Sequence, residues 1–569
     1  MFAIRHAVVT ALLLLPGLSV ASPQTFPQAV VAADHPAASA AGIEMLQQGG
    51  NVVDAAVATS FALSVVRPAS CGIGGGGFML IWDAEKHQAV ALDYRERAPA
   101  SATPEMFAQN GAASQPEDAS VRGGRAVAVP GTVAGLCYAA EHYGTLPLAT
   151  LLAPAIRLAH EGVAVDEFDV EAQHDTLGKL NRFAGYDSRF ASLRRLYLNR
   201  GQLWSAGDRF HSPQHRLLQI IAAEGRAGFY EGRVAEAIAG TVRNHGGAMT
   251  MDDLRTMQPV VRAALVRRFG GADIVTMPPP SSGGVALLQM LQTLERWETE
   301  SGRSLNSLHQ NSADYIHVVT EAMKHAFADR AEFLGDSDFV DVPVRRLLDA
   351  DYAGGMAGKI TLNRTLSQEA YGRFFNRPDA GTSHFSVIDA AGNAVACTET
   401  INLTYGSFVV VPEFGVVLNN EMDDFAARPG EPNAFGLIQS NANAVAAGKK
   451  PLSSMTPTIL VVDNQAVFAS GASGGPRIIS ATLQSILNHV VFGMPPDQAV
   501  ATPRFHHQWS PNELLLEEAI PDAVARDLQS RGHAVKRSSG LAAAQAAARD
   551  ASGLTGGSDP RKGGKPAGF

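Results

Sequence analysis

Apolar residues recur along the chain with two different periods, and each period predicts a different kind of element. Short apolar runs at 29–33 and 78–82 predict strands, and further strands are expected from Phe385 to Ala469. Helical spacing predicts helices over 37–48, 53–66, 131–143, 147–161, 283–298 and 311–334, and a mostly helical region over 165–245. The Ala- and Gly-rich tail from Ala542 matches neither period, so its structure is not predicted.

The N-terminus has the three-part order of a secretion signal. Arg5 and His6 precede an apolar run from Ala7 to Leu18, and Ser19-Val20-Ala21 is a small-x-small cleavage site. The run is shorter than the roughly 20 apolar residues that cross a bilayer. Residues 1–21 are therefore predicted to be a signal peptide, with a buried N-terminal helix as the alternative.

Composition excludes several classes of protein. The 569 residues carry a net charge of −9, with 46% apolar and 18% charged residues, which argues against general disorder and against a basic nucleic-acid surface. Cys71, Cys137 and Cys397 are too few and too widely spaced for a disulfide framework or a metal site. No metal or cofactor is expected.

Two glycine motifs match signatures of known chemistry. Gly72-x-Gly74-x-x-Gly77 matches the dinucleotide fingerprint, but it follows a predicted helix and precedes a strand, which is the reverse of the required order. A tight backbone turn is the better interpretation. Gly471-Ala472-Ser473-Gly474-Gly475 matches the serine nucleophile elbow between a strand and a helix. An upstream oxyanion loop is missing, yet His506, His507 and His533 follow, so Ser473 remains an alternative nucleophile.

Two further segments have ordinary structural interpretations. Pro278 to Gly284 is expected to form a rigid turn before a helix, capped by Ser281 or Ser282. Thr382 begins a predicted strand after the loop that ends at Gly381. Taken alone, this threonine is an ordinary strand residue.

Six blocks of the sequence change that interpretation. They are Asp93-Tyr94-Arg95-Glu96, Pro130-Gly131-Thr132-Val133-Ala134-Gly135, Thr382-Ser383-His384, Leu418-Asn419-Asn420-Glu421-Met422-Asp423-Asp424-Phe425, Pro451-Leu452-Ser453-Ser454-Met455 and Pro503-Arg504-Phe505-His506-His507-Gln508-Trp509. Together these blocks resemble the gamma-glutamyltransferase (gamma-glutamyltranspeptidase) family. The resemblance covers about residues 29–540, and its blocks occur in the family's order.

The resemblance implies an α+β fold, the four-layer αββα sandwich of N-terminal-nucleophile hydrolases. It also implies self-cleavage between Gly381 and Thr382, giving a large subunit, 22–381, and a small catalytic subunit, 382–569, which stay together as a heterodimer. Chemistry supports the cut, because a threonine hydroxyl needs an adjacent base. A freed α-amino group, with a reference pKa of about 7.7–8.0, supplies one.

The same resemblance implies the remaining site residues. Thr400 would orient Thr382, and the backbone N–H groups of Gly474 and Gly475 would form the oxyanion hole. The substrate's α-carboxylate would bind Arg95, Ser453 and Ser454, and its α-ammonium would bind Asn402, Glu421 and Asp424. Without the resemblance, Asp423-Asp424 is a solvated acidic turn, and Arg95 with Glu96 and Arg97 is a surface charge cluster.

The expected function is hydrolysis of glutathione and other γ-glutamyl amides, with transfer to water or to amino acid and peptide acceptors, in an exported, most simply periplasmic, enzyme. An acylase on the same scaffold and an exported amino-acid-binding protein are the alternatives. Two departures from the family stand out. Phe435 replaces a lid tyrosine that would bond Asn402, and Leu541 to Ala548 is Ala-rich where a Gly-Ser-Thr-Gln-like strand is expected, which predicts weaker packing there.

Overall fold

The computed structural model describes residues 24–107, 119–372, 381–426 and 440–569. The predicted signal peptide and Phe435 lie outside these ranges. None of the helices in the described ranges is long and apolar enough to cross a membrane.

Two seven-stranded sheets form the centre of the molecule, and every pairing within them is antiparallel. Both sheets combine strands from before and after Gly381. The first runs in the order β1 (Thr25–Phe26), β20 (Gly553–Ser558), β19 (Ala543–Asp550), β15 (Gln465–Ser473), β14 (Thr458–Val462), β9 (Ala272–Thr276), β8 (Leu265–Phe269). The second runs β21 (Ala567–Gly568), β2 (Ala29–Ala33), β10 (Ser383–Asp389), β11 (Ala394–Thr400), β3 (Gly76–Asp83), β4 (Gln88–Asp93), β7 (Val260–Arg262).

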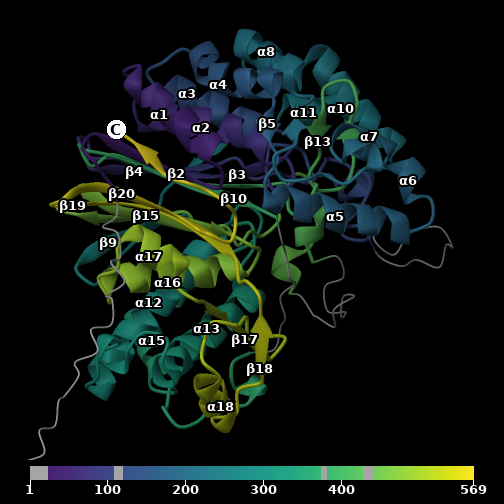
Figure 1. Cartoon of the computed structure of the whole chain (residues 1–569). Coiled ribbons are helices and arrows are strands. Elements are labelled where there is room, and N and C mark those ends of the chain that lie inside the picture. Colours follow the sequence, from purple (N-terminus) through teal and green to yellow (C-terminus); the bar gives the residue numbers. More distant parts are fainter. Residues whose placement is uncertain (1–23, 108–118, 373–380, 427–439) are drawn as a thin grey trace, which may run out of the picture.

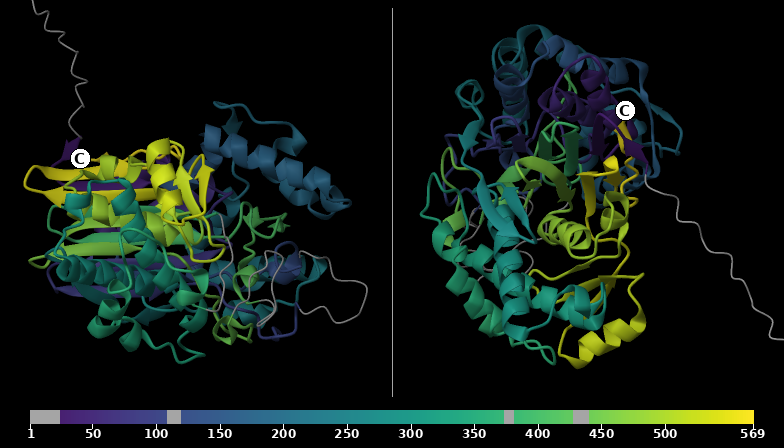
Figure 2. Two further views of the ribbon diagram at one scale, coloured as in Figure 1. Left: turned by 90° about the horizontal axis from the view of Figure 1, so that it is seen from below. Right: turned by 90° about the vertical axis from the view of Figure 1, so that its left-hand side faces the viewer.

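Helices cover the outer face of each sheet (Figures 1 and 2). Over the second sheet lie α1 (Pro36–Gln47), α2 (Val52–Val66), α3 (Thr132–Tyr143), α4 (Leu148–Glu161) and α8 (His215–Glu224). Below the first sheet lie α12 (Ser282–Ser301), α13 (Ala313–Phe333), α15 (Ala350–Ala357), α16 (Arg477–Val490) and α17 (Pro496–Ala501). The predicted four-layer αββα sandwich is confirmed.

Smaller elements flank these layers. The mostly helical region predicted over 165–245 is confirmed as α5 (Glu167–Arg182), α6 (Tyr186–Arg189), α7 (Ala191–Leu196), α8, α9 (Ala227–Tyr230) and α10 (Gly232–Asn244). Beyond α17, β16 (Phe505–His506), β17 (Leu514–Glu517) and β18 (Val535–Ser538) form a small sheet beside α18 (Asp522–Ser530).

The central strands are apolar on both sides because both faces of the second sheet are covered. In β3, Phe78 and Leu80 belong to the core that the second sheet shares with the first sheet and its helices. Met79 and Ile81 point the other way and belong to the core beneath the helices that cover the second sheet. Successive strand side chains point to opposite faces. This explains why the run at 78–82 is continuously apolar rather than alternating.

One local expectation needs correction, and another stays a prediction. The Ala-rich stretch forms β19 in the interior of the first sheet, and the side chains from Ala543 to Ala548 are buried. The weaker packing expected of these small side chains stays a prediction. Alanine favours helices, so tertiary pairing with β15 and β20 overrides its intrinsic preference. Ser281 does occupy the N-cap of α12, but its side chain makes no capping bond. Its hydroxyl donates to the carbonyl oxygen of Met455 instead, at 2.7 Å.

Candidate active site

Thr382 lies directly before the first residue of β10, beside the end of the neighbouring strand β11. Its Oγ1 donates to the carbonyl oxygen of Gly381 at 2.6 Å and lies 3.2 Å from Oγ1 of Thr400. Oγ1 of Thr400 donates to the same carbonyl oxygen, also at 2.6 Å. Both threonines are buried, so Thr400 is not the solvent-facing strand residue of the alternative interpretation. Two hydroxyl groups therefore converge on the peptide bond predicted to be cut.

Asn402 connects this pair to the predicted substrate pocket. Its backbone N–H donates to Oγ1 of Thr400 at 2.8 Å, and its side-chain Nδ2 donates to the carbonyl oxygen of Asn420 at 3.0 Å. The side-chain oxygen Oδ1 is buried and has no hydrogen-bond partner among the described residues. A buried acceptor without a partner is costly. Asn402 thus presents an acceptor for which the described residues provide no donor.

Arg95 and three acids form the charged part of the pocket. The Arg95 guanidinium lies 2.7 Å from Oε2 of Glu421 and 3.6 Å from Oε2 of Glu96, and it also pairs with Asp424. Arg95, Glu96 and Glu421 are almost fully buried. The interpretation of Arg95 and Glu96 as a surface cluster is therefore wrong, and Glu421–Asp424 is a buried 3-10 turn with only Asp424 partly exposed.

Burial and charge act in opposite directions on this cluster. Burial alone lowers the pKa of the Arg95 guanidinium, but the charges of Glu421, Asp424 and Glu96 outweigh it and raise the pKa. Burial also raises the pKa of the Glu96 carboxyl, and the attraction of Arg95 opposes that shift. Among the charges acting on Glu96, Arg95 has the largest effect, and Lys450 adds a smaller one in the same direction.

Arg95 contacts the segment that leads into Ser453 and Ser454. The Arg95 side chain donates to the carbonyl oxygen of Pro451 at 3.3 Å and to that of Leu452 at 3.5 Å, directly before the two serines. Sequence analysis missed a second arginine here, because Arg330 belongs to a helix far away in the sequence. Its Nη2 donates to Oγ of Ser454 at 2.9 Å.

Gly474 and Gly475 follow β15, which lies against β10 across the two sheets. Both have positive φ angles, 127° and 63°, in the region that favours glycine. Lys562, which sequence analysis also missed, links this turn to Thr382. Its Nζ lies 3.3 Å from Oγ of Ser383 and 3.4 Å from Oγ of Ser473, and it donates to the carbonyl oxygen of Thr382.

Lys562 also makes a buried ion pair with Asp34, at 2.6 Å. Lys562→Met leaves Asp34 as a buried charge without its cation, so the free energy of unfolding should fall by about 3–5 kcal/mol. Denaturant titration measures this change. The matched control is exposed Lys565→Met, which should shift stability by less than about 0.5 kcal/mol. An unchanged transition in Lys562→Met would show that the ion pair adds no stability.

Ser473 lacks the surroundings of a serine nucleophile. Its Oγ donates to the carbonyl oxygen of Ala543 at 3.3 Å. His506 instead contacts Ser480 and Gln508, His507 contacts Asn512, and His533 contacts His317. We expect Ser473→Ala to keep its turnover within about tenfold of the parent, since it removes no reacting group. Complete loss of turnover, with normal chain cleavage, would favour the serine alternative.

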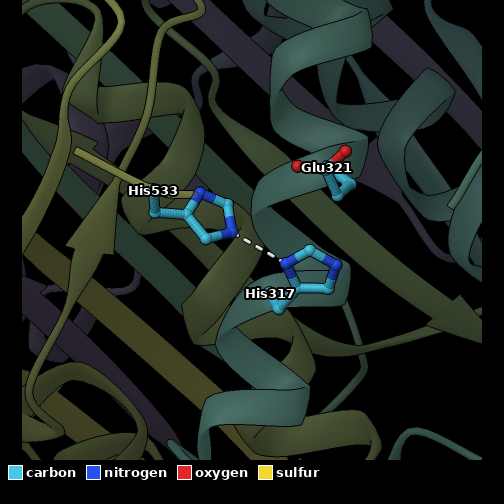
Figure 3. A group of neighbouring side chains, drawn as sticks. All are labelled: His317, Glu321 and His533. Carbon is cyan, nitrogen blue, oxygen red and sulfur yellow. Dashed lines mark hydrogen bonds between the residues drawn. The ribbon is translucent and has the colours of Figure 1, made fainter. Parts of the chain in front are cut away.

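Figure 3 shows the group of described residues that could supply metal ligands: His317 and Glu321 on α13, with His533. Nδ1 of His317 lies 2.7 Å from Nε2 of His533, whereas two nitrogens sharing a tetrahedral zinc ion lie about 3.3 Å apart. Burial lowers the pKa of His533 to about 2. Glu321 already pairs with Lys324 at 3.1 Å. These contacts favour a neutral, hydrogen-bonded histidine pair.

Known proteins resemble this chain over most of its length. The glutathione hydrolase proenzyme of Escherichia coli K12 is 37% identical over 540 residues, covering 94% of this chain and 90% of the relative. The corresponding proenzyme of Pseudomonas sp. A14 is 40% identical, covering 88% and 85%. An acylase proenzyme, ACY 1 of Pseudomonas sp. SE83, is 38% identical, covering 91% and 88%.

Solved structures of related proteins also resemble this chain. A cephalosporin acylase from Bacillus halodurans matches with a TM-score of 0.84 at 28% identity, covering 99% of each chain. The gamma-glutamyltranspeptidase of Helicobacter pylori matches with a TM-score of 0.54 at 36% identity, covering 60% of this chain and 93% of that one. The family model described as Gamma-glutamyltranspeptidase matches residues 38–569. The chain therefore belongs to the gamma-glutamyltranspeptidase family.

Proposed function

We propose that this enzyme cleaves itself before Thr382 and then cleaves glutathione and other γ-glutamyl amides. The γ-glutamyl group passes through an ester on Thr382 to water or to an amino acid or peptide amine. The observation that carries the proposal is a path from the Gly381–Thr382 peptide bond to Arg95. Hydrogen bonds lead through Thr400 and Asn402 to the backbone of Asn420, and its chain neighbour Glu421 pairs with Arg95.

Self-cleavage begins with the hydroxyl of Thr382. Its oxygen attacks the carbonyl carbon of Gly381, while the hydroxyl of Thr400 donates to the carbonyl oxygen on which negative charge develops. The C–N bond breaks, the nitrogen takes the hydroxyl proton, and an ester joins Gly381 to Thr382. Water then hydrolyses that ester. The products are a carboxylate on Gly381 and a free α-amine on Thr382.

The free amine supplies the base for turnover. It accepts the Thr382 hydroxyl proton as the oxygen attacks the γ-carbonyl carbon of the substrate, and it returns that proton to the leaving amine. Gly474 and Gly475 would donate their backbone N–H groups to the tetrahedral oxyanion, and one such donor contributes about 3 kcal/mol. The second half-reaction repeats these steps with water or an acceptor amine.

The pocket matches the α-amino acid end of a γ-glutamyl group. In the structure, Arg95 pairs with Glu421 and Asp424. A bound zwitterion would divide that pairing, with its carboxylate on Arg95, Ser453 and Ser454 and its ammonium on the two acids. Oδ1 of Asn402, which accepts no hydrogen bond from the part of the chain that the structure describes, would accept a further bond from the ammonium. These charges also suit an amino-acid-binding protein, but such a protein would neither split nor turn substrate over.

An acylase activity is the second candidate, because an acylase proenzyme and a cephalosporin acylase structure are among the similar proteins. A glutaryl substrate lacks the α-ammonium and would leave Glu421 and Asp424 without a cationic ligand. We expect release of aniline from a γ-glutamyl anilide to exceed release from a glutaryl anilide by about 100-fold in kcat/KM. A preference for the glutaryl substrate would identify an acylase.

Processing and export complete the proposal. Residues 1–21 would be removed as a signal peptide, 22–381 would form the large subunit, and 382–569 the small one, and both would remain together in the periplasm. The interleaved sheets support a lasting heterodimer, because β10 and β11 of the small subunit lie between β2 and β3 of the large one. Mass spectrometry of the secreted protein tests both predicted cleavages, the one after residue 21 and the one after Gly381.

A further inference from the structure

We infer that Arg330, together with the segment Pro278–Gly284, positions Ser453 and Ser454 to receive the substrate's α-carboxylate. This inference rests on the proposed function. It assigns a role to a motif that sequence analysis treated only as a turn before a helix. It makes Arg330 a positioning residue, which acts on the substrate through Ser454.

The segment Pro278–Gly284 is bonded to the serine segment at several points. Backbone N–H of Ser453 donates to the carbonyl oxygen of Pro280 at 3.0 Å, and N–H of Ser282 donates to the carbonyl oxygen of Ser453 at 2.7 Å. The hydroxyl of Ser282 donates to that same oxygen at 2.6 Å. The backbone N–H and the carbonyl oxygen of Ser453 are therefore both held by the segment Pro278–Gly284.

Gly283 permits this close approach. A Cβ atom on Gly283 would lie 1.9 Å from Oγ1 of Thr456 and 2.9 Å from the carbonyl oxygen of Ser454. Real side chains do not approach so closely, so any larger residue would push the two segments apart. The paired glycines at the end of the motif therefore have a packing reason beyond the turn itself.

Arg330 joins the two segments through its side chain. From α13, its Nε donates to Oγ of Ser282 at 2.7 Å and its Nη2 donates to Oγ of Ser454 at 2.9 Å. Arg330 is 7% exposed, and both serines are buried. One planar guanidinium thus holds a hydroxyl on each segment, a fork that a lysine ammonium on a flexible stem does not reproduce.

The direction of these bonds determines what Ser454 can offer. A guanidinium only donates, so Oγ of Ser454 must accept from Arg330, and its own O–H is left to donate. A substrate carboxylate is an acceptor and matches that free donor. The positive charge behind the hydroxyl strengthens the donated bond. Arg95, which binds the carbonyl oxygens of Pro451 and Leu452, approaches the same segment.

The test compares two substrates in four variants. The substrates are γ-glutamyl anilide and 4-aminobutyryl anilide, which lacks the α-carboxylate. The variants are Arg330→Met, Ser454→Ala, the double variant, and Arg303→Met as an exposed control. Separation into two subunits on a denaturing gel verifies folding. If Arg330→Met does not process, Arg330→Lys and Ser282→Ala are measured in its place.

We expect Arg330→Met to raise KM for γ-glutamyl anilide by about 10- to 100-fold, with kcat changed by less than about threefold. For 4-aminobutyryl anilide it should change little. The double variant should match Ser454→Ala alone, because Arg330 acts through that hydroxyl. Arg330→Lys, with charge but no fork, should recover only part of the loss, and Ser282→Ala should raise KM only for the carboxylate-bearing substrate.

Two results would overturn the inference. Equal losses for both substrates would indicate a general structural role for Arg330, and additive losses in the double variant would show that it acts independently of Ser454. Failure of the proposed function is distinguishable, because the parent enzyme would then show no preference for γ-glutamyl anilide over 4-aminobutyryl anilide before any arginine is changed.

Discussion

Thr382→Ala is expected to abolish both chain cleavage and turnover. The hydroxyl that approaches the Gly381 carbonyl is removed, so the acyl shift cannot start and no free amine forms. Loss of a nucleophile that also carries the base should lower kcat by about 10⁴- to 10⁶-fold. A denaturing gel should show one band, and release from γ-glutamyl anilide should fall to background.

Thr382→Ser is the matched control because it keeps a hydroxyl and, after cleavage, an α-amine. We expect it to yield two bands and measurable turnover. The methyl group of threonine restricts side-chain rotation, so the serine variant should process more slowly. If Thr382→Ala still splits into the two subunits, another residue performs the cleavage.

Arg95→Met is expected to have the second largest effect. The substitution removes the carboxylate-binding cation and leaves Glu421, Asp424 and Glu96 without the charge that balances them. Breaking a buried charge pair costs several kcal/mol, so kcat/KM for γ-glutamyl anilide should fall by about 100- to 1,000-fold. The ratio of γ-glutamyl to 4-aminobutyryl anilide turnover should approach one.

Arg95→Lys separates charge from geometry in this pocket. A lysine keeps the positive charge but cannot bind a carboxylate with two parallel bonds. We expect a loss intermediate between the parent and Arg95→Met, with normal chain cleavage in both variants. Unchanged substrate preference in Arg95→Met would place the carboxylate site elsewhere.

Sequence periodicity predicted the helical layers well because their apolar faces are long. The helices expected over 53–66 and 311–334 correspond to α2 and α13. The structure of the tail from Ala542 could not be predicted, for a physical reason. Its alanines lack the bulk that marks a strand, and only the neighbouring strands β15 and β20 determine that β19 is extended.

The residues of the candidate site likewise fall into those that the sequence predicted and those that it did not. Motif blocks predicted the residues around Thr382 and Arg95, which the fold brings into one network. Lys562 and Arg330 were missed because a single basic residue in a glycine-rich tail or in a long helix carries no periodic signal. Their roles depend on contacts 180 and 124 residues away along the chain. Only the tertiary structure brings them to the site.

The central claim is that cleavage converts the nitrogen of Thr382 into the catalytic base. The most direct test follows freshly purified precursor over time, measuring the cleaved fraction by intact mass and γ-glutamyl anilide turnover in the same samples. The account predicts activity proportional to the amount of small subunit, extrapolating to zero when no chain is cut. Substantial turnover by precursor that remains uncut would contradict it.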